Sequence, residues 1–487
     1  MTFKLRDYQQ KLVDSCIASL KGGHKKPLLV LPTGGGKTAI ASELVRRSFC
    51  KNKSSIFICH RQELIYQTIR TYKKNNIEPA VILSGVKPDY SNPIQIASVN
   101  TLIKRLDKVT QPKVVFWDEC QHCMSNTWLT VANAFPDAFH IGLTATPCRL
   151  DGKPLNLAFD DMIEVINTKQ LIEQGYLSPY QYYAPSNIDT SELKVGSHGD
   201  YTQKSLMNAS FNSSVVGDNI EHYRKLADGK RNIVFAVSRN HAAEITQRYR
   251  EAGYTAEMLD GTMSRNTRET IVKKFTEGQI SVLVNVDLFG EGFDLPAVEV
   301  VSLLRPTAST SLYLQQVGRG LRICEGKTSA IILDHVNNYK RHGLPDLVRE
   351  WSLSDGLNKR KHSISSDIAI KRCPMCFFAH TPALKCPNCG YIYRADGKKI
   401  HEVAGELVLL GSEEYRQAEQ KELIMADTYE DFIRIEKRRG YKRFWAEKQW
   451  LFKSGINLWS DMKGLQCIAK ARGYGVGWVW VQLRNRR

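Results

Sequence analysis

The sequence of 487 residues is long enough for two to four domains, and its hydrophobic content of 42% excludes a disordered chain. It contains no apolar run of the roughly 18 residues that a membrane-spanning helix needs, and it does not begin with the charged and then apolar pattern of a secretory signal. We therefore expect a soluble, intracellular protein with no membrane partner. The net charge of +18 suits a polyanionic partner, but a solvated basic surface explains such a charge about equally well.

The first motif is a glycine-rich turn between a strand and a helix. Residues 28–31 form a short apolar run typical of a buried parallel strand, and residues 39–45 have helical spacing. Glycines let the backbone wrap a phosphate closely, and the helix that follows presents its N-terminus to the same anion. The candidate ATP-binding residues are Gly34, Gly35, Gly36, Lys37, expected to reach the outer phosphates, and Thr38, expected to hold Mg²⁺. The generic pattern would place another glycine at position 31, where this sequence has Leu31.

The second motif is a pair of carboxylates after another apolar run, residues 113–117. Asp118 is expected to hold Mg²⁺, and Glu119 to orient and deprotonate the attacking water, because phosphoryl transfer needs mainly positioning and charge neutralisation. His122 completes the motif and is a further catalytic candidate. Cys120 and Cys123 also form a C-x-x-C pair, so a metal clip is the competing interpretation, although the acidic pair explains the segment better.

Two later motifs complete the series. Residues 142–147 read Gly-Leu-Thr-Ala-Thr-Pro, and residues 315–322 read Gln-Gln-Val-Gly-Arg-Gly-Leu-Arg. In kind and order the four motifs resemble the DExH type of superfamily 2 helicases and translocases, the group that includes XPB, RecG and the type III restriction subunits. The resemblance covers roughly residues 1–345. It implies an α/β fold with two tandem RecA-like parallel-sheet domains that close around ATP.

The resemblance also assigns residues. It implies that Arg6 and Gln9 recognise adenine and that Gly292 and Asp294 make further contacts with the nucleotide. It also implies that the nucleic-acid backbone is contacted by His60, Arg61, Ser98 and Thr101. Thr144 and Thr146 are the residues that would couple hydrolysis to movement. The second domain supplies Gln315, Arg319 and Arg322 as catalytic residues. An arginine offers a fixed charged fork for phosphate oxygens, and from the opposite domain it acts only when the cleft is closed.

Four of the twelve cysteines form two C-x-x-C knuckles separated by nine residues: Cys373, Cys376, Cys386 and Cys389. This spacing predicts a zinc ribbon with a tetrahedral Zn²⁺. Disulfides are a poor alternative, because the other eight cysteines are scattered in an apparently cytosolic enzyme. We expect the metal to supply much of the folding energy of so small a unit, with an accessory DNA contact.

The C-terminal region is strongly basic. From residue 359 onward the net charge is +11, and basic residues alternate with tryptophans. This pattern suits backbone neutralisation with base stacking, but amphipathic helices around a tryptophan core explain it somewhat better. The region weakly resembles extensions of phage and prophage helicases, so we expect a cytoplasmic protein of a bacterial or phage-infected cell.

We predict RecA-like domains at residues 1–157 and 158–347, a zinc ribbon at 365–395 and a basic, helical accessory module at 396–487. The expected activity is that of an ATP-dependent DNA helicase or translocase acting on single-stranded or forked DNA, with ATP, Mg²⁺ and Zn²⁺ as cofactors. The alternatives are an RNA helicase, the motor subunit of a restriction or defence complex, and an ATP-switched remodeller of replication complexes. A replication, repair or defence protein is therefore an expected partner.

Overall fold

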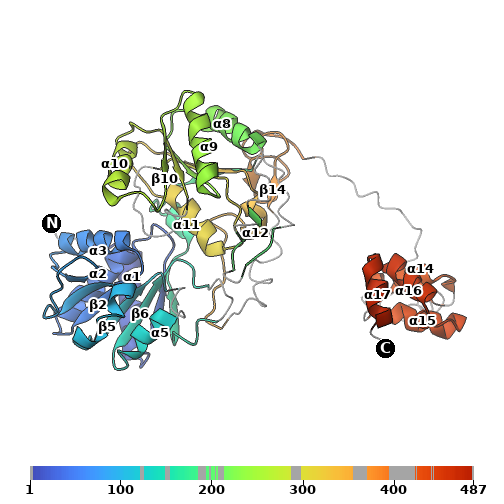
Figure 1. The fold of residues 1–487 in the computed structure, drawn as a ribbon, viewed down its shortest axis with the longest axis horizontal. Coiled ribbons are helices and arrows are strands. Elements are labelled where there is room, and N and C mark those ends of the chain that lie inside the picture. The colour runs from blue at the N-terminus through green and yellow to red at the C-terminus, as the bar shows by residue number, and fades with distance from the viewer. Residues whose placement is uncertain are drawn as a thin grey trace. The chain divides into compact units, whose positions relative to one another are not determined.

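A computed structural model describes residues 4–120, 126–148, 154–184, 193–196, 199–202, 205–206, 213–286, 298–354, 370–393, 423, 425–439, 441 and 444–484. The chain divides into two compact units, Met1–Arg394 and Ala395–Arg487. Within these described ranges, no helix is both long enough and apolar enough to span a membrane. Figure 1 labels the main elements.

The first sheet has seven parallel strands in the order β3-β4-β2-β5-β6-β1-β7. The strands are β1 (Pro27–Val30), β2 (Ser55–Cys59), β3 (Ala80–Ile82), β4 (Ile94–Ser98), β5 (Val114–Asp118), β6 (Phe139–Thr144) and β7 (Asp161–Glu164). The edge strand β7 belongs to the first sheet, although it begins after residue 157, where the sequence analysis placed the boundary between the two domains. Its ends are acidic and it is only partly buried, so it lacks the apolar run that marks the central strands.

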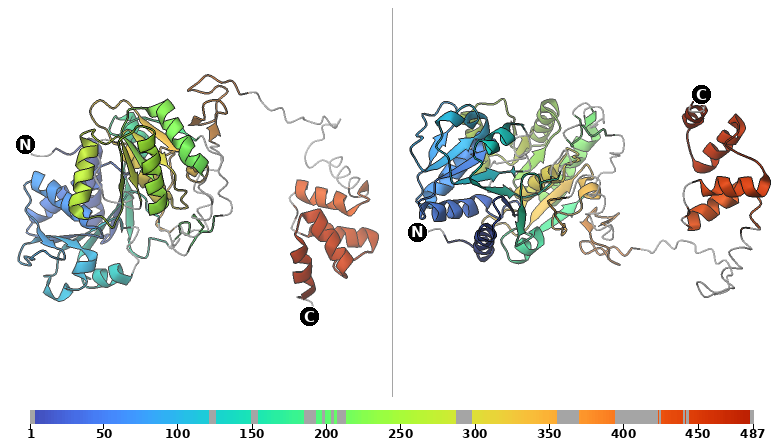
Figure 2. Two further views of the ribbon diagram at one scale, coloured as in Figure 1. Left: turned by 45° about the horizontal axis from the view of Figure 1, so that its top comes forward. Right: turned by 90° about the horizontal axis from the view of Figure 1, so that it is seen from below.

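Helices cover both faces of this sheet (Figures 1 and 2). Their bounds are α1 (Asp7–Lys21), α2 (Lys37–Phe49), α3 (Gln62–Lys74), α4 (Val99–Leu102), a 3-10 turn (Leu106–Lys108) and α5 (Asn126–Asn133). Buried side chains of α1, α2 and α3 pack on one face, whereas those of α4 and α5 pack on the other around Trp117 and Trp128, whose ring centroids are 4.8 Å apart.

The second sheet has six parallel strands in the order β10-β11-β9-β12-β13-β8. The strands are β8 (Tyr180–Tyr183), β9 (Asn232–Phe235), β10 (Ala256–Leu259), β11 (Val282–Asn285), β12 (Val300–Leu303) and β13 (Ala330–Asp334). The helices are α6 (Thr168–Glu173) in the connection, then α8 (Ser213–Ala227), α9 (Arg239–Glu251), α10 (Arg265–Thr276), α11 (Thr310–Gly320) and α12 (Asn338–His342). The predicted fold of two tandem parallel-sheet domains is confirmed, and one continuous apolar cluster joins both sheets.

The cysteine knuckles lie against the second sheet. Strands β14 (Lys371–Arg372) and β15 (Ala379–His380) form a small antiparallel pair. The N–H of Ala184, just after the edge strand β8, donates to the carbonyl of Phe377 at 3.0 Å, and Phe378 forms an antiparallel bridge with Tyr183. The ribbon therefore covers the edge of the second sheet, which would otherwise present unpaired backbone groups.

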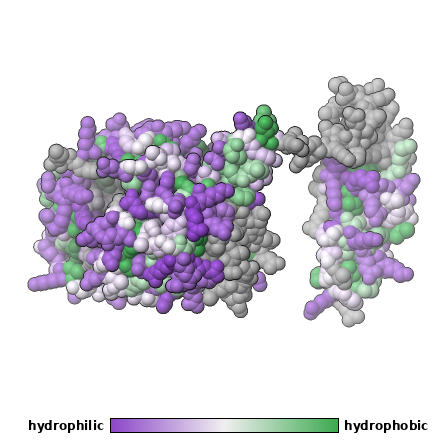
Figure 3. All heavy atoms as spheres, turned by 90° about the horizontal axis from the view of Figure 1, so that it is seen from above, coloured by the Kyte–Doolittle hydropathy of each residue, from purple (hydrophilic) through white to green (hydrophobic). Residues whose placement is uncertain are grey.

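The second unit is helical, as expected. It contains α14 (Tyr429–Arg439), α15 (Trp445–Ser454), α16 (Met462–Arg472) and α17 (Val476–Arg484) around their own apolar core. Arg472 donates to Glu436 at 2.8 and 2.9 Å and to Glu447 at 2.6 Å, so one buried guanidinium serves two buried carboxylates. Apolar and hydrophilic residues mix on the surface of this unit (Figure 3), where Phe452 is 91% exposed.

Candidate active site

The glycine-rich loop between β1 and α2 has the conformation that a phosphate site needs. Gly34 and Gly36 have φ angles of 87° and 92°, which disfavour any residue with a Cβ atom. A Cβ atom on Gly35 would lie 2.7 Å from the Cγ atom of Leu31. The residue that replaces the first glycine of the generic pattern therefore packs under the loop and fills the space there.

The N-terminal segment holds this loop from one side. The carbonyl of Gly35 accepts hydrogen bonds from the hydroxyl of Tyr8 and the amide of Gln9, both at 2.9 Å. The guanidinium of Arg6 lies 4.6 Å from the ring centroid of Tyr176, which in turn packs on Tyr8. Both predicted adenine-recognition residues thus lie at the nucleotide loop, and their contact with adenine stays a prediction.

The two carboxylates lie at the carboxyl end of β5 and are almost fully buried. Burial, reinforced by the charge of Glu119, raises the pKa of Asp118 to about 7. Glu119 has a φ of 49°, a left-handed conformation that costs a non-glycine residue roughly 1–3 kcal/mol. This conformation brings its carboxylate to 3.0 Å from the Nζ atom of Lys37.

The second sheet contributes α11 to the same site. The amide of Gln315 donates to the second carboxylate oxygen of Glu119 at 3.3 Å. Gly318 lies so close to the glycine-rich loop that a Cβ atom there would be 2.7 Å from Thr33. The Cγ atom of Arg322 would lie 3.7 Å from a Cβ atom on Gly34. Motif residues separated by almost 300 positions therefore meet across one cleft.

A cavity of about 320 Å³ lies in this cleft. The predicted site residues that line it are Arg6, Gly34, Gly36, Lys37, Thr38, Asp118, Glu119, Gln315, Arg319 and Arg322. Sequence reasoning missed the others: Thr33, Leu64, Gln67, Tyr176, Leu177 and Ile323. Asp118 and Thr38 line the same cavity, and carboxylate and hydroxyl oxygens are ligands that suit a divalent cation, so these residues fit the expected Mg²⁺.

The threonines assigned to coupling lie where the two domains touch. Thr144 accepts from the N–H of Thr146 at 3.1 Å and fixes the turn after β6. The hydroxyl of Thr146 then donates to that of Ser311 on α11 at 2.6 Å, and all three side chains are buried. A second contact between the domains is an ion pair of 2.7 Å between Glu63 on α3 and Arg268 on α10.

The residues assigned to nucleic acid lie at the carboxyl ends of neighbouring strands. His60 and Arg61 follow β2, and Ser98 ends β4 in register with Cys59, with Thr101 on the short helix α4. His60 lies close enough to Asp118 for its charge to lower the pKa of that carboxyl. Ser98 is only 6% exposed, so its side chain offers little surface to a ligand. Three other predicted site residues, His122, Gly292 and Asp294, lie outside the described residues.

The four cysteines of the ribbon converge. Their sulfur atoms all lie within 4.8 Å of one another, and the Cys373–Cys389 and Cys376–Cys386 pairs are 3.5 and 3.7 Å apart. Four thiolates at the usual Zn–S distance of roughly 2.3 Å have sulfur–sulfur separations of roughly 3.8 Å. The cluster therefore fits one tetrahedral Zn²⁺.

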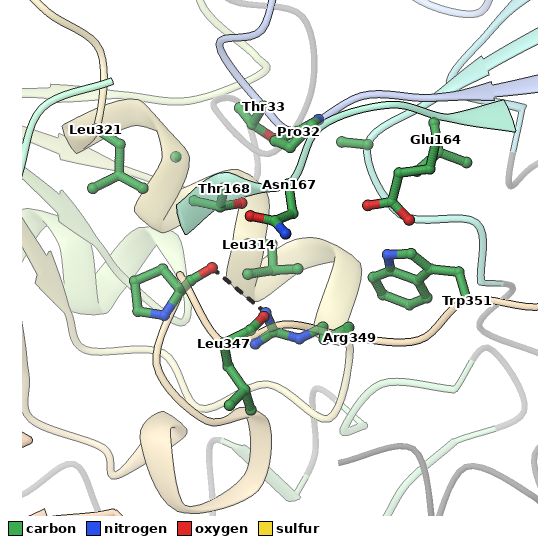
Figure 4. A pocket seen from close by; sticks show the side chains of 14 residues that line it. Pro32, Thr33, Glu164, Asn167, Thr168, Leu314, Leu321, Leu347, Arg349 and Trp351 are labelled. Atoms are coloured by element: carbon green, nitrogen blue, oxygen red, sulfur yellow. Dashed lines mark hydrogen bonds between the residues drawn. The ribbon is translucent and has the colours of Figure 1, made fainter. Parts of the chain in front are cut away.

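A second, smaller cavity of about 40 Å³ marks where the chain returns from the second sheet to the first (Figure 4). Arg349 is fixed on the side of the second sheet, because it donates to the carbonyls of His342 and Leu347 at 2.7 and 2.9 Å. Trp351 and Leu353 pack against the core of the first sheet, and the carbonyl of Leu353 accepts from the N–H of Leu155 at 2.8 Å. This return strap, residues 349–353, runs from the second sheet to the first, where packing and a backbone hydrogen bond hold it.

Comparisons with known proteins agree with this geometry. Residues 2–149 match the family described as "Type III restriction enzyme, res subunit", and residues 216–324 match the "Helicase conserved C-terminal domain". A "51.5 kDa protein" of a Lactococcus phage is 32% identical over 389 residues, which cover 79% of this chain and 82% of that protein.

Two further relatives have more informative names. The "Putative ATP-dependent helicase IRC3" of Saccharomyces cerevisiae is 30% identical over 68% of this chain, which spans only 51% of that protein. The "DNA 3'-5' translocase XPB2" of Sulfurisphaera tokodaii is 24% identical over 66% of this chain and 79% of its own length. Among solved structures, a fragment of a putative HsdR subunit of a type I restriction enzyme from Vibrio vulnificus has the same fold, with a TM-score of 0.56 at 22% identity, over 70% of this chain and 67% of that one.

Proposed function

This chain belongs to the superfamily 2 helicases and translocases, whose members use ATP to act on nucleic acid, and we propose that it is a DNA motor that couples ATP hydrolysis to movement and strand separation. The observation that carries the proposal is the cleft itself. A phosphate loop and a carboxylate pair from the first sheet face Gln315, Arg319 and Arg322 from the second. A site divided in this way completes itself only when the domains close.

The roles follow from the geometry. The glycine-rich loop and Lys37 bind the phosphates, which draw the ammonium away from Glu119. Thr38 and Asp118 would hold Mg²⁺, which would neutralise phosphate charge. The freed carboxylate of Glu119, still oriented by Gln315, accepts the proton of the attacking water. Arg319 and Arg322 stabilise the charge of the transition state from the opposite domain.

The contact between Thr146 and Ser311 gives hydrolysis a route to movement. It joins the turn after β6 directly to α11, the helix that carries Gln315 and Arg319. A change in phosphate charge that shifts α11 therefore also shifts the carboxyl edge of the first sheet, where His60, Arg61 and Thr101 are the proposed contacts with the DNA backbone. Ser98 is a weaker candidate because it is buried.

The choice of DNA rests on the XPB2 relative, which is named a DNA translocase, and on the basic charge of the chain. The match to the restriction-enzyme family supports a second candidate, the motor subunit of a restriction or defence complex. That candidate requires a partner chain, whereas the first does not. We further propose that the ribbon holds Zn²⁺ and that the helical unit gives accessory contacts to the DNA backbone.

The test measures ATP hydrolysis and strand separation with single-stranded, forked and duplex DNA and with matched RNA. The proposal predicts stimulation by DNA, strongest with single-stranded or forked substrates, and unwinding of the fork. Glu119→Gln should bind ATP but hardly hydrolyse it, and it serves as the inactive control. Stimulation by RNA alone would replace the proposal with an RNA helicase, and hydrolysis indifferent to both would indicate an ATP-driven switch. Hydrolysis of ATP on duplex DNA without strand separation would favour the restriction motor.

A further inference from the structure

Lys327 lies seven residues after the end of α11, the helix that carries Arg319. Its ammonium group donates to the carbonyls of Val298 at 2.8 Å, Arg322 at 2.9 Å and Gly320 at a still shorter distance. An ammonium group has three N–H donors and can accept nothing, so these three carbonyls use its whole hydrogen-bonding capacity. Burial lowers the pKa of Lys327 to about 8, and the charged form still predominates at neutral pH.

Two of the carbonyls that Lys327 binds are those of Gly320, the last residue of α11, and of Arg322, two residues beyond it. The last carbonyls of a helix have no partner within the helix, and a lysine there satisfies them and interacts favourably with the helix dipole. The intervening carbonyl, that of Leu321, accepts from the N–H of Ser178 at 2.8 Å. Three consecutive carbonyls are therefore fixed, two by Lys327 and one by the connection between the domains.

This fixed turn is where Arg322 leaves the helix. Gly320 packs so tightly on β12 that a Cβ atom there would lie 2.7 Å from Val301, so the sheet supports the turn from below. On the other side, Arg322 lies over Gly34 of the phosphate loop. The direction of the Arg322 side chain is thus set by a backbone turn whose carbonyls Lys327 holds.

We propose that Lys327 is a positioning residue for hydrolysis: it acts through Arg322 by fixing the carbonyls of Gly320 and Arg322, and so holds the guanidinium in the geometry that the closed cleft needs. The proposal rests on the proposed function, because it requires Arg322 to act on ATP. Lys327 is not among the residues that line the nucleotide cavity.

The test is a double-mutant cycle of Lys327→Met and Arg322→Ala, measured as kcat and KM for ATP in the full-length protein with single-stranded DNA. Lys327→Met keeps the length and apolar stem of the side chain but removes its donors. We expect kcat to fall about 10- to 100-fold, with KM changed less than about threefold, because the phosphate loop is untouched. In the Arg322→Ala background the same change should alter kcat less than about twofold. Lys225→Met, on the exposed surface of α8, is the matched control and should behave as the wild type.

Each outcome has a distinct meaning. If Arg322→Ala alone leaves kcat unchanged, the arginine assignment and the proposed function fail. If Arg322→Ala slows turnover but Lys327→Met does not, or if the two effects multiply independently, only the positioning role fails. Lys327→Arg, which keeps the charge and the donors, should recover most of kcat. If that variant unfolds at the same lowered temperature as Lys327→Met and does not recover turnover, Lys327 only stabilises the fold and the proposal is overturned.

Discussion

The close approach of Gly318 to the glycine-rich loop gives a quantitative test of cleft closure. In Gly318→Ala the new Cβ atom would lie 2.7 Å from both the Cβ and Cγ2 atoms of Thr33. Carbon atoms in ordinary contact are roughly 3.5–4.0 Å apart, so α11 must retreat from the loop by roughly 1 Å. Arg319 is the next residue of the same helix and moves with it. A misplacement of roughly 1 Å can cost about 100-fold in rate, so we expect kcat for ATP hydrolysis to fall by about that factor.

Steady-state ATP hydrolysis gives kcat, and binding of a fluorescent ATP analogue shows whether the phosphate loop still accepts nucleotide. Affinity should change much less than kcat, because the first domain is intact. Thr33→Gly removes both clashing atoms, so adding it to Gly318→Ala should restore kcat to that of Thr33→Gly alone. Gly475→Ala, where a Cβ atom meets nothing within 4 Å, is the control. Wild-type turnover by Gly318→Ala would show that α11 and the glycine-rich loop do not approach this closely during hydrolysis.

Three other predictions concern groups that the structure buries. Because the pKa of Asp118 is raised to about 7, a proton competes with Mg²⁺ as pH falls below 7. The apparent Mg²⁺ affinity, measured as Mg²⁺-dependent binding of a fluorescent ATP analogue, should weaken about tenfold per pH unit, and Asp118→Asn should lose this pH dependence. Cys386→Ser should lower the zinc content below the expected one ion per chain. Because the ribbon covers β8, the variant should also exchange the amide hydrogen of Ala184 faster, and an unchanged exchange rate would show that the metal is not needed to hold the ribbon on the sheet. Arg472→Met leaves two buried glutamates without their cation and should destabilise the helical unit by roughly 3–5 kcal/mol in thermal unfolding, while basal ATPase is retained.

The sequence predicted the site best where functional residues lie at or just after the ends of buried strands. Asp118 and Thr144 each end a buried strand, and Lys37 follows the loop after another, so parallel pairing alone predicts that they share one edge of a sheet. The prediction that Arg319 and Arg322 lie opposite this edge could not be made from strand pairing. It came from the resemblance to a known family, because no local pattern relates residue 118 to residue 319.

The residues that were missed act through tertiary contacts. Tyr176 reaches the nucleotide cavity from the connection between the domains, where no motif marks it. Ser311, Glu63 and Arg268 become informative only when the two domains are placed together. The ribbon was predicted from its cysteine spacing, but its attachment to β8 depends on backbone hydrogen bonds, which any residue can make.

The return strap has a mechanical consequence. Between Arg349, anchored on the second sheet, and Trp351, anchored on the first, the chain is two residues long and can extend to roughly 7 Å at most. The first connection, between β7 and β8, runs in parallel with it. A pull that separates the domains is therefore resisted by this covalent connection and by the non-covalent packing of the strap on the first sheet, and the strap has almost no slack. As long as Trp351 and Leu353 stay packed on the first sheet, the strap permits the cleft to open by rotation about it but not by translation of one domain away from the other.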